Sequence, residues 1–556
     1  MLSQIDNLYK LISLGKISEA EIEILKLIQN DTKNNEYIFI YGIILARKKN
    51  FMSAISQFKK TIDDKKYIYD SHFNIGSCYQ GIGDFNTAIY YFNKCHILND
   101  SKYEPLQKIG ICLRSSGEYQ KSNQYLDLSL KLFKNTHTIY LMASNQRNLG
   151  QFKEAKQSIK NLLNLDKDNY DAVLLLANIE MDEGNFEKSN NLIDTILQNK
   201  LLNKNYIIAA KIDKGNIYKF QGDYNEAINC YNKVLEIDQK NSSASYNLSI
   251  CYLFLGKYKL GWMYHEERKN LSVFGNLRRR LNKLKKPLWD QTKKREKILI
   301  WGEQGIGEQI LYSQYIHKIE GSFKKIIIAV DEKIISFFKN LFPKIEIISL
   351  NDLFLFKDFD FHLPMGSLGF NFHHLLIENK IVNNHRYTFQ NNLIPIKKKK
   401  IRCGISWKSV NKLFGHKKSI NLNNFNKIFM LNEIEFINLQ FLYDQKEIHE
   451  IENKLNRKIF LEHQIDCFND ISGVASLINS CDLVITISNT NAHIGGKLNI
   501  KTLLLLPYSD GKLWYWGTEN EKKIMWYPSI TPIRQKKPDL WDDPINEIYT
   551  YLENLL

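Results

Sequence analysis

Apolar and small residues recur with a long, regular period through the first half of the chain. Each copy has a Gly, replaced by Lys49 in the second copy, then an apolar residue two positions later and a small residue three positions beyond that. Successive small residues lie 34 residues apart, with one step of 33 and one of 38. The eight copies are Gly15/Ile17/Ala20, Lys49/Phe51/Ala54, Gly83/Phe85/Ala88, Gly117/Tyr119/Ser122, Gly150/Phe152/Ala155, Gly184/Phe186/Ser189, Gly222/Tyr224/Ala227 and Gly256/Tyr258/Gly261.

A pair of packed helices explains each copy. The Gly ends the first helix in a left-handed conformation, which a Cβ would disfavour. The small residue lets the second helix approach closely, and Gly76, Tyr79 and Phe92 fill the seam around Ala88. The period is that of tetratricopeptide repeats, which stack into an α-solenoid with a concave groove. We interpret the step of 38 as a lengthened turn around residues 198–205.

The pattern changes after about residue 270, where short apolar runs alternate with amphipathic stretches. Such alternation is typical of parallel sheets with helices between the strands. The sequence therefore predicts a repeat solenoid over 1–270, a basic linker over 271–294, and two Rossmann-like lobes over 295–396 and 397–556. The expected strands are 297–301, 325–330, 345–349, 360–363, 403–407, 435–440, 458–461, 483–487 and 502–506, with helices at 308–319, 334–341, 422–430, 446–455, 471–479 and from 490.

The charge of this 556-residue chain is strongly basic, +16 at neutral pH. Lys, Asn and Ile are abundant throughout, so this charge reflects general composition. The basic runs 278–280 and 397–400 lie where linkers are expected and lack interleaved aromatics, so we predict no nucleic-acid partner.

Eight scattered cysteines form no CxxC pair and no metal-ligand spacing with histidine, which fits buried thiols in a reducing compartment. The first repeat begins at the amino terminus without the pattern of a signal peptide. No apolar run approaches the roughly 20 residues of a membrane helix. We therefore expect a cytoplasmic location and no transmembrane segment.

Two motifs follow expected strands and open expected helices. The first is WGEQGIGEQ, whose Gly302, Gly305 and Gly307 leave backbone amides accessible to an anion, although packing alone would also explain them. It is neither a dinucleotide-binding GxGxxG nor a phosphate loop. The second runs from Asp482 to Gly496 and carries the following candidates for a ligand or a helix cap: Ser488, Asn489, Thr490, His493, Gly495 and Gly496.

Lysines near a third expected strand could neutralise a departing diphosphate. Lys417 and Lys418 follow the sequence GISWKS by a short loop, although in a Lys-rich chain either could be a surface residue. Asp358 and Asp360 have DxD spacing, but their apolar neighbours favour strand alternation. We predict no metal and no cofactor.

Several motifs in order resemble bacterial tetratricopeptide proteins with a carboxy-terminal heptosyltransferase-like glycosyltransferase domain of the GT-B fold. The motifs are PLWD at 287–290, GEQGIGEQ at 302–309, LPMGSL at 363–368, GISWK at 404–408, KSI at 418–420, NTNAHIGG at 489–496, LPY at 506–508, WYP at 526–528 and RQ at 534–535. The resemblance covers nearly the whole chain.

The resemblance implies metal-independent, inverting transfer of a sugar from a nucleotide-sugar donor, the co-substrate, to an acceptor. Glu308 takes the position of the family's suggested base, which is usually Asp. Lys417 or Lys418 matches the basic residue near the donor phosphates, while Thr490, His493 and the Gly pair match the donor-binding helix start. The family commonly has Asp where this chain has Ser488, a change that puts donor choice and activity in question. A protein, lipid or polysaccharide acceptor is equally compatible with the sequence.

Two further points bear on partners. O-linked N-acetylglucosamine transferases combine similar repeats with a GT-B domain and line the groove with a recurring Asn. Here only Asn74 and Asn247 occupy that position among the eight repeats, so the peptide-binding ladder is absent. The alternative function is a non-catalytic adaptor, with a protein partner in the solenoid groove and a degenerate glycosyltransferase fold.

Overall fold

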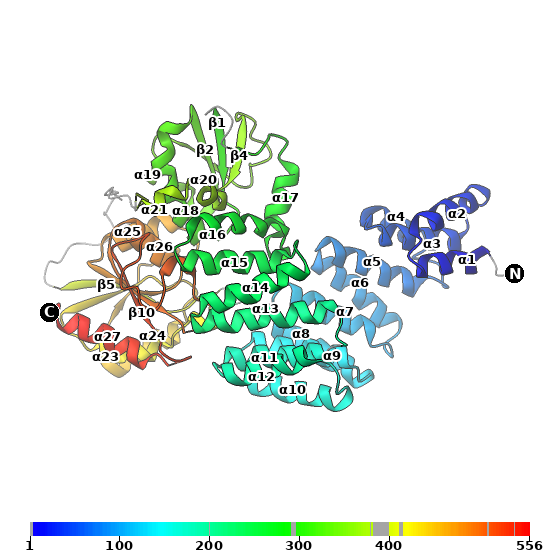
Figure 1. Ribbon diagram of the computed structural model, residues 1–556, viewed down its shortest axis with the longest axis horizontal. Helices are drawn as coiled ribbons and strands as arrows, with labels where there is room; N and C mark the ends of the chain where they lie inside the picture. The colour runs from blue at the N-terminus through cyan, green and yellow to red at the C-terminus, as the bar shows by residue number, and fades with distance from the viewer. Residues whose placement is uncertain are drawn as a thin grey trace. The chain divides into compact units, whose positions relative to one another are not determined.

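The structure is a computed structural model that describes residues 4–199, 201–290, 296–378, 380–381, 400–410, 415–508, 511–538 and 540–556; the side chain of His416 lies outside this description. The chain forms two compact units, Met1–Ile179 and Glu180–Leu556. This division differs from the expected boundary at residue 270, because the last repeats form one unit with the α/β part of the chain. Figure 1 shows the course of the chain.

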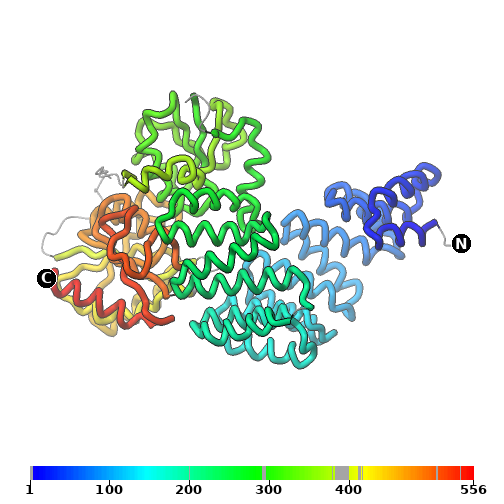
Figure 2. Tube along the Cα trace, viewed as in Figure 1, coloured from blue at the N-terminus to red at the C-terminus, as the bar shows by residue number. Residues whose placement is uncertain are grey.

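Helices in pairs make up the first half of the described chain, as the repeat pattern predicts, and Figure 2 shows successive helices of the first unit lying side by side. They are α1 (Gln4–Ser13), α2 (Ile17–Asn30), α3 (Asn35–Arg47), α4 (Phe51–Lys60), α5 (Ile68–Ile82), α6 (Phe85–Leu98), α7 (Glu104–Ser115), α8 (Tyr119–Leu132), α9 (Thr136–Asn148), α10 (Phe152–Leu165), α11 (Tyr170–Asp182), α12 (Phe186–Gln198), α13 (Lys204–Gln221), α14 (Tyr224–Ile237), α15 (Ser242–Phe254) and α16 (Tyr258–His265).

The repeat marker has the backbone conformation that the sequence predicts. The residue between the two helices has a left-handed φ in every repeat, from 61° at Lys49 to 90° at Gly83. The small residues are buried, and a Cβ on Gly76 would lie 2.9 Å from the Phe92 ring. The lengthened turn that we expected at the 38-residue step is mainly a longer helix, because α13 has 18 residues whereas α11 and α15 have 13.

The segment 271–290, expected to be part of a linker, contains ordered helix. A short 3₁₀ helix η1 (Glu266–Asn270) and another, η2 (Ser272–Phe274), lead into α17 (Gly275–Lys283). Leu277 of α17 is buried against the first sheet, in a cluster with Leu299 and Trp301. The basic run 278–280 therefore belongs to an amphipathic helix. Residues 291–295 and 397–399, part of the other linker expectations, lie outside the described residues.

The first sheet is parallel throughout, with strand order β3-β2-β1-β4. Its strands are β1 (Lys297–Trp301), β2 (Lys325–Val330), β3 (Glu346–Ser349) and β4 (Phe361–Pro364). Helices α18 (Ile306–Ile319) and α19 (Ile335–Leu341) cover one face, and α17 lies against the other. This part also contains three short 3₁₀ helices, η3 (Glu320–Ser322), η4 (Glu332–Ile334) and η5 (Met365–Ser367). Two short α-helices follow η5: α20 (Leu368–Phe372) and α21 (His374–Ile377).

The second sheet is also parallel, with strand order β10-β9-β8-β5-β6-β7. Its strands are β5 (Ile401–Ser406), β6 (Ile434–Asn438), β7 (Ile459–Phe460), β8 (Leu483–Ile487), β9 (Lys501–Leu506) and β10 (Ile530–Arg534). Its helices are α22 (Gly415–Lys418), η6 (Leu422–Phe425), α23 (Asn426–Phe429), α24 (Gln445–Leu455), α25 (Ile471–Asn479), α26 (Thr490–Lys497), η7 (Trp514–Trp516) and α27 (Asp542–Glu553). The two faces are buried in separate clusters, one under α23, α24 and α27 and the other under α25 and α26.

A single large core joins the last repeat to the first sheet and to part of the second. Trp262 of α16 is fully buried, and its ring centroid lies 5.5 Å from that of Trp514 and 5.8 Å from that of Tyr312. A Cβ on Gly369 would lie 2.1 Å from the Trp262 ring, so only glycine fits beneath it. The end of the solenoid is thus built into the α/β core.

Candidate functional site

The Gly-rich turn connects the carboxyl end of β1 to the start of α18. Gly302 donates its amide to the carbonyl of Ala329 on the neighbouring strand, and Gly305 caps α18 with extended backbone. A Cβ on Gly302 would lie 2.5 Å from Cδ of Gln309. The Gln309 side chain in turn donates to the Gln304 carbonyl, 2.9 Å away. Close packing therefore requires the absence of a side chain at Gly302.

Glu308 lies in the first turn of α18 and is half-buried. Its Oε1 accepts a hydrogen bond of 3.0 Å from the hydroxyl of Tyr515, which η7 contributes from the chain between β9 and β10. A Cβ on Gly305 would lie 2.8 Å from the other carboxylate oxygen, so Glu308 folds back over the helix start. The positive end of the helix dipole favours a negative charge at this place.

His493 of α26 is buried, and its ring lies against α18. The side chain is 3% exposed, its Nδ1 lies 3.2 Å from the Tyr527 hydroxyl, and its ring centroid lies 4.7 Å from that of Trp516. A Cβ on Gly307 would lie 2.7 Å from the imidazole. Burial, and secondarily the charge of Lys418, lowers the pKa of His493 to about 3, so its ring is neutral near pH 7.

The polar residues at the end of β8 hold the start of α26 in place. Asn489 caps the helix by accepting from the Asn491 amide, and it donates to Ser406 of the neighbouring strand β5 at 3.0 Å. The hydroxyl of Ser488 accepts from the indole N–H of Trp516 at 2.9 Å. Thr490 is half-buried at the first position of the helix. These bonds fix the helix start close to the strand ends.

The Gly495–Gly496 pair permits close packing of α26. A Cβ on Gly495 would lie 2.6 Å from the Thr502 hydroxyl, and one on Gly496 would lie 2.4 Å from the Tyr527 ring. Both glycines face other parts of the protein, so their observed role is in packing.

The two candidate lysines have different surroundings. Lys417 pairs with Asp182 of α11 at 3.0 Å, and the Asp182 side chain is 3% exposed. Lys418 is 6% exposed, and Gly511, whose φ is +93°, lies against its aliphatic stem. Burial lowers the pKa of Lys418, and the charge of Glu308 opposes this effect. Lys418 thus lies within electrostatic reach of Glu308.

The site also contains aromatic residues that the sequence did not lead us to select. Tyr515, Trp516 and Tyr527 surround His493, and burial, followed by the charge of Glu308, raises the pKa of Tyr515 well above its usual value. The only sequence signal was the concentration of aromatics in 514–516 and 526–527, which is equally typical of a core.

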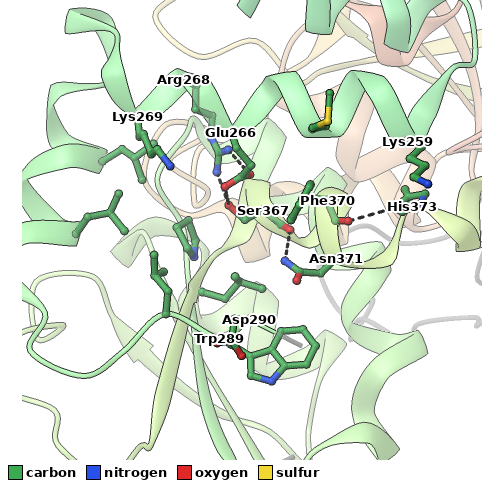
Figure 3. Close-up of a pocket in the computed structure, with 16 residues that line it drawn as sticks. Lys259, Glu266, Arg268, Lys269, Trp289, Asp290, Ser367, Phe370, Asn371 and His373 are labelled. Carbon is green, nitrogen blue, oxygen red and sulfur yellow. Dashed lines mark hydrogen bonds and ion pairs between the residues drawn. The ribbon is translucent and has the colours of Figure 1, made fainter. Parts of the chain in front are cut away.

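A cavity of about 570 Å³ lies where the last repeat, α17 and the first sheet meet. Figure 3 shows it, with Lys259 above and Trp289 below. Its wall is largely apolar, while Glu266, Arg268 and Ser367 form a hydrogen-bonded group on one side. Figure 3 also shows Asn371 donating to the Ser367 carbonyl.

Metal-ligand geometry is absent from the described part of the chain, where no group of three or more His, Cys, Asp and Glu residues could hold an ion. The DxD-spaced residues have other partners: Asp358 pairs with Lys297 and Lys325, and Asp360 accepts from the Lys297 amide. None of the described helices is both long and apolar enough to cross a membrane.

Comparison with family models identifies the repeats. A model described as TPR repeat matches residues 215–256, and models described as tetratricopeptide repeat match residues 148–206 and 69–95. The first half of the chain contains tetratricopeptide repeats. These tetratricopeptide repeats agree in position with the helix pairs of the structure.

Individual relatives resemble part of the chain. The human protein O-mannosyl-transferase TMTC1 is 22% identical over 231 residues, which are 39% of this chain and 26% of that protein, so the chain spans about a quarter of that relative's length. A tetratricopeptide repeat protein from Parabacteroides merdae is 15% identical with a TM-score of 0.39, over 45% of this chain and 97% of that one. Yeast Tom70 is 17% identical with a TM-score of 0.38, over 46% of this chain and 55% of that one.

Proposed function

We propose that the protein is a metal-independent, inverting glycosyltransferase of the GT-B fold, whose tetratricopeptide repeats recruit the acceptor. The observation that carries the proposal is the pairing of Glu308, from the helix after β1, with Tyr515, from the second lobe, within the electrostatic reach of the buried Lys418. The carboxylate of Glu308 lies at the start of a helix that follows a parallel strand, the usual ligand edge of such sheets, and its charge acts on the ammonium group of Lys418. The similarity to a relative named a mannosyltransferase also supports transfer of a sugar.

In this proposal Glu308 is the general base. Its carboxylate accepts the proton of the acceptor hydroxyl while the hydroxyl oxygen attacks the anomeric carbon. The bond from that carbon to the phosphate oxygen breaks on the opposite face, so the configuration inverts and the electron pair leaves with the nucleotide. The hydrogen bond from Tyr515 orients the carboxylate.

The charge of the departing nucleotide would be stabilised by Lys418 and by the start of α26. Lys418 is largely withdrawn from water, where an ammonium group interacts more strongly with an anion. Thr490 lies at the first turn of α26, next to the amides that a phosphate would meet. We assign Ser488, Asn489, His493 and the Gly495–Gly496 pair to the support of this helix start, and we propose no resident cofactor.

The acceptor would approach from the first lobe. The cavity beside the last repeat provides an apolar wall and polar groups of both signs, including Lys259 and Asp290. A mixture of this kind is usual for sites that bind small molecules or single side chains. The solenoid groove would hold a larger part of a protein partner. The eight free cysteines in the structure support a reducing compartment such as the cytoplasm.

A binding experiment tests this proposal. Thermal unfolding would be followed with UDP-, GDP-, ADP- and CMP-sugars, because a ligand that binds the folded state raises Tm. We expect one nucleotide class to raise Tm for the wild type and for Lys417→Met, but not for Lys418→Met. A Lys418→Met variant that responds like the wild type would contradict the assigned donor site.

The second candidate function is a non-catalytic adaptor. It is favoured by two observations: Ser488 offers no carboxylate and is bonded to Trp516, and Lys417 is bound to Asp182 of the solenoid. An adaptor would show no transfer with any sugar nucleotide and would retain partner binding after substitution of Glu308.

A further inference from the structure

Two arginines from the segment between the last repeat and β1 hold the Gly-rich turn. Arg268 of η1 donates to Oε1 of Glu303 at 3.0 Å, and Arg280 of α17 donates to the Gly302 carbonyl at 2.8 Å. Glu303 and Gly302 are both residues of the turn that leads to Glu308. We call Arg268 and Arg280 the arginine clamp.

The Arg268–Glu303 pair is the more buried half of the clamp, since each side chain is 1% exposed. Arg268 also donates to Glu266 at 2.7 Å and to the Ser367 hydroxyl at 2.9 Å. Burial acts against the guanidinium charge, but the carboxylates of Glu266 and Glu303 outweigh it, so the pKa of Arg268 is raised. A buried charge pair contributes little net stability but is strongly destabilising to break, because one charge then stays unpaired.

Glu303 in turn fixes the neighbouring strand end. Its two carboxylate oxygens accept from the Gly366 amide at 3.0 and 3.2 Å, just beyond β4. A Cβ on Gly366 would lie 2.3 Å from Glu303, so the approach requires glycine. The turn after β1 and the turn after β4 are therefore tied together through one carboxylate, and Arg268 neutralises that carboxylate.

We propose that Arg268 and Arg280 are positioning residues that hold the Gly-rich turn, and with it Glu308, in the geometry for proton transfer. The segment that follows the last repeat thus supplies part of the active-site support. Arg268 also lines the 570 Å³ cavity, so a molecule bound there touches the group that holds the turn. The catalytic part of this inference rests on the proposed function, whereas the ordering of the turn does not.

Variants can separate positioning from simple stability. Arg268→Met alone would leave Glu303 buried and unpaired, so it is combined with Glu303→Gln, whose side-chain carbonyl can still accept from Gly366. Arg280→Met removes the bond to Gly302, and Arg279→Met is the matched control, because Arg279 is exposed on the same helix. The readouts are Tm, kcat and KM for the donor, and hydrogen exchange of the amides of residues 302–308.

The double variant and Arg280→Met should keep a Tm close to that of the wild type. We expect kcat to fall about 10- to 100-fold with little change in KM, because a displacement near 1 Å can lower the rate about 100-fold. Exchange in 302–308 should become faster, and Arg279→Met should behave like the wild type.

The outcomes distinguish this inference from the proposed function. Wild-type turnover with unchanged kcat and unchanged exchange in the variants would overturn the arginine clamp alone. No wild-type turnover with any sugar nucleotide would overturn the proposed function, and faster exchange in the variants would then still support the clamp as the support of the turn. A lower kcat in the variants with unchanged hydrogen exchange of residues 302–308 would overturn the proposal that the arginines position the turn.

Discussion

Glu308 has partners that lie far from it in the sequence. Tyr515, more than two hundred residues away, donates to its carboxylate, and the charge of Glu308 acts on the buried Lys418. The resemblance to heptosyltransferases implied Glu308, and a position near a strand end suggested Lys418. Tyr515 could not be selected, because nothing in the local pattern of 514–516 specifies what its hydroxyl meets. His493 shows the opposite case, since a histidine that we selected as a ligand candidate lies in the core.

At the residue scale, Lys49 allows a test of whether glycine is preferred at the left-handed position between the two helices of a repeat. It has φ 61° at the position where the seven other repeats have a glycine in the left-handed conformation. A left-handed conformation is unfavourable for a residue with a Cβ by about 1–2 kcal/mol. Lys49→Gly should therefore stabilise the first unit by about 0.5–1 kcal/mol, after the entropy that glycine adds to the unfolded chain.

Urea unfolding followed by circular dichroism would measure this change. Gly83→Ala provides the reverse substitution at an equivalent position with φ 90°, and it should lower the midpoint. Equal midpoints for Lys49→Gly and the wild type would show that the lysine is not strained.

At the scale of elements, the pattern of the sequence predicted most of the structure. The strands at 297–301, 325–330 and 483–487 have the expected bounds, and the repeat helices follow the 34-residue period. The missed elements have weak patterns. Helix α17 carries three consecutive arginines and only a narrow apolar face, and β10 contains Pro532, which is tolerated because β10 is an edge strand.

The contact between α18 and α26 depends on the absence of a side chain at Gly307. A Cβ there would lie 2.7 Å from the ring of His493, which is enclosed by Tyr515, Trp516 and Tyr527. We expect Gly307→Ala to destabilise the protein by about 1–3 kcal/mol, the usual range for overpacking.

Differential scanning calorimetry would measure this effect as a lower Tm. The control is Gly321→Ala, since a Cβ on Gly321 would meet no atom within 4 Å. If both variants have the same Tm, the close approach of α18 and α26 is not rigid.

At the scale of the whole molecule, the last repeats and the two sheets form one structure. The compact unit begins at Glu180, and Trp262 of the last repeat is enclosed by residues of both lobes. The sequence predicts a repeat boundary near 270 from a change of period, but a change of period does not reveal which helices share a core. Packing between distant segments decides that.

Lys497 joins the two lobes, and its burial leads us to expect a stability that depends on pH. Its ammonium donates to Gln314 of α18 at 3.0 Å, and burial lowers its pKa from 10.5 to about 7. Between these two values the unfolded chain binds more protons than the folded one, so stability should rise with pH from about 7 to 10.5 because of this group.

Melting temperatures of the wild type and Lys497→Met across pH 7–10 would test this effect by difference. The wild type should gain stability relative to the variant as the pH rises. Lys339→Met, at an exposed position of α19, is the control and should follow the wild type. Parallel pH profiles for the wild type and Lys497→Met would contradict the assignment.

In the proposed mechanism Glu308 is the base of a glycosyl transfer. The measurement is release of nucleotide from the sugar nucleotide that raises Tm, in the presence of acceptor, by the wild type and by Glu308→Gln. The amide preserves the size of the side chain but cannot take up the proton, so we expect the rate to fall about 100- to 10,000-fold while donor binding is retained. Release at the wild-type rate by Glu308→Gln would contradict the claim.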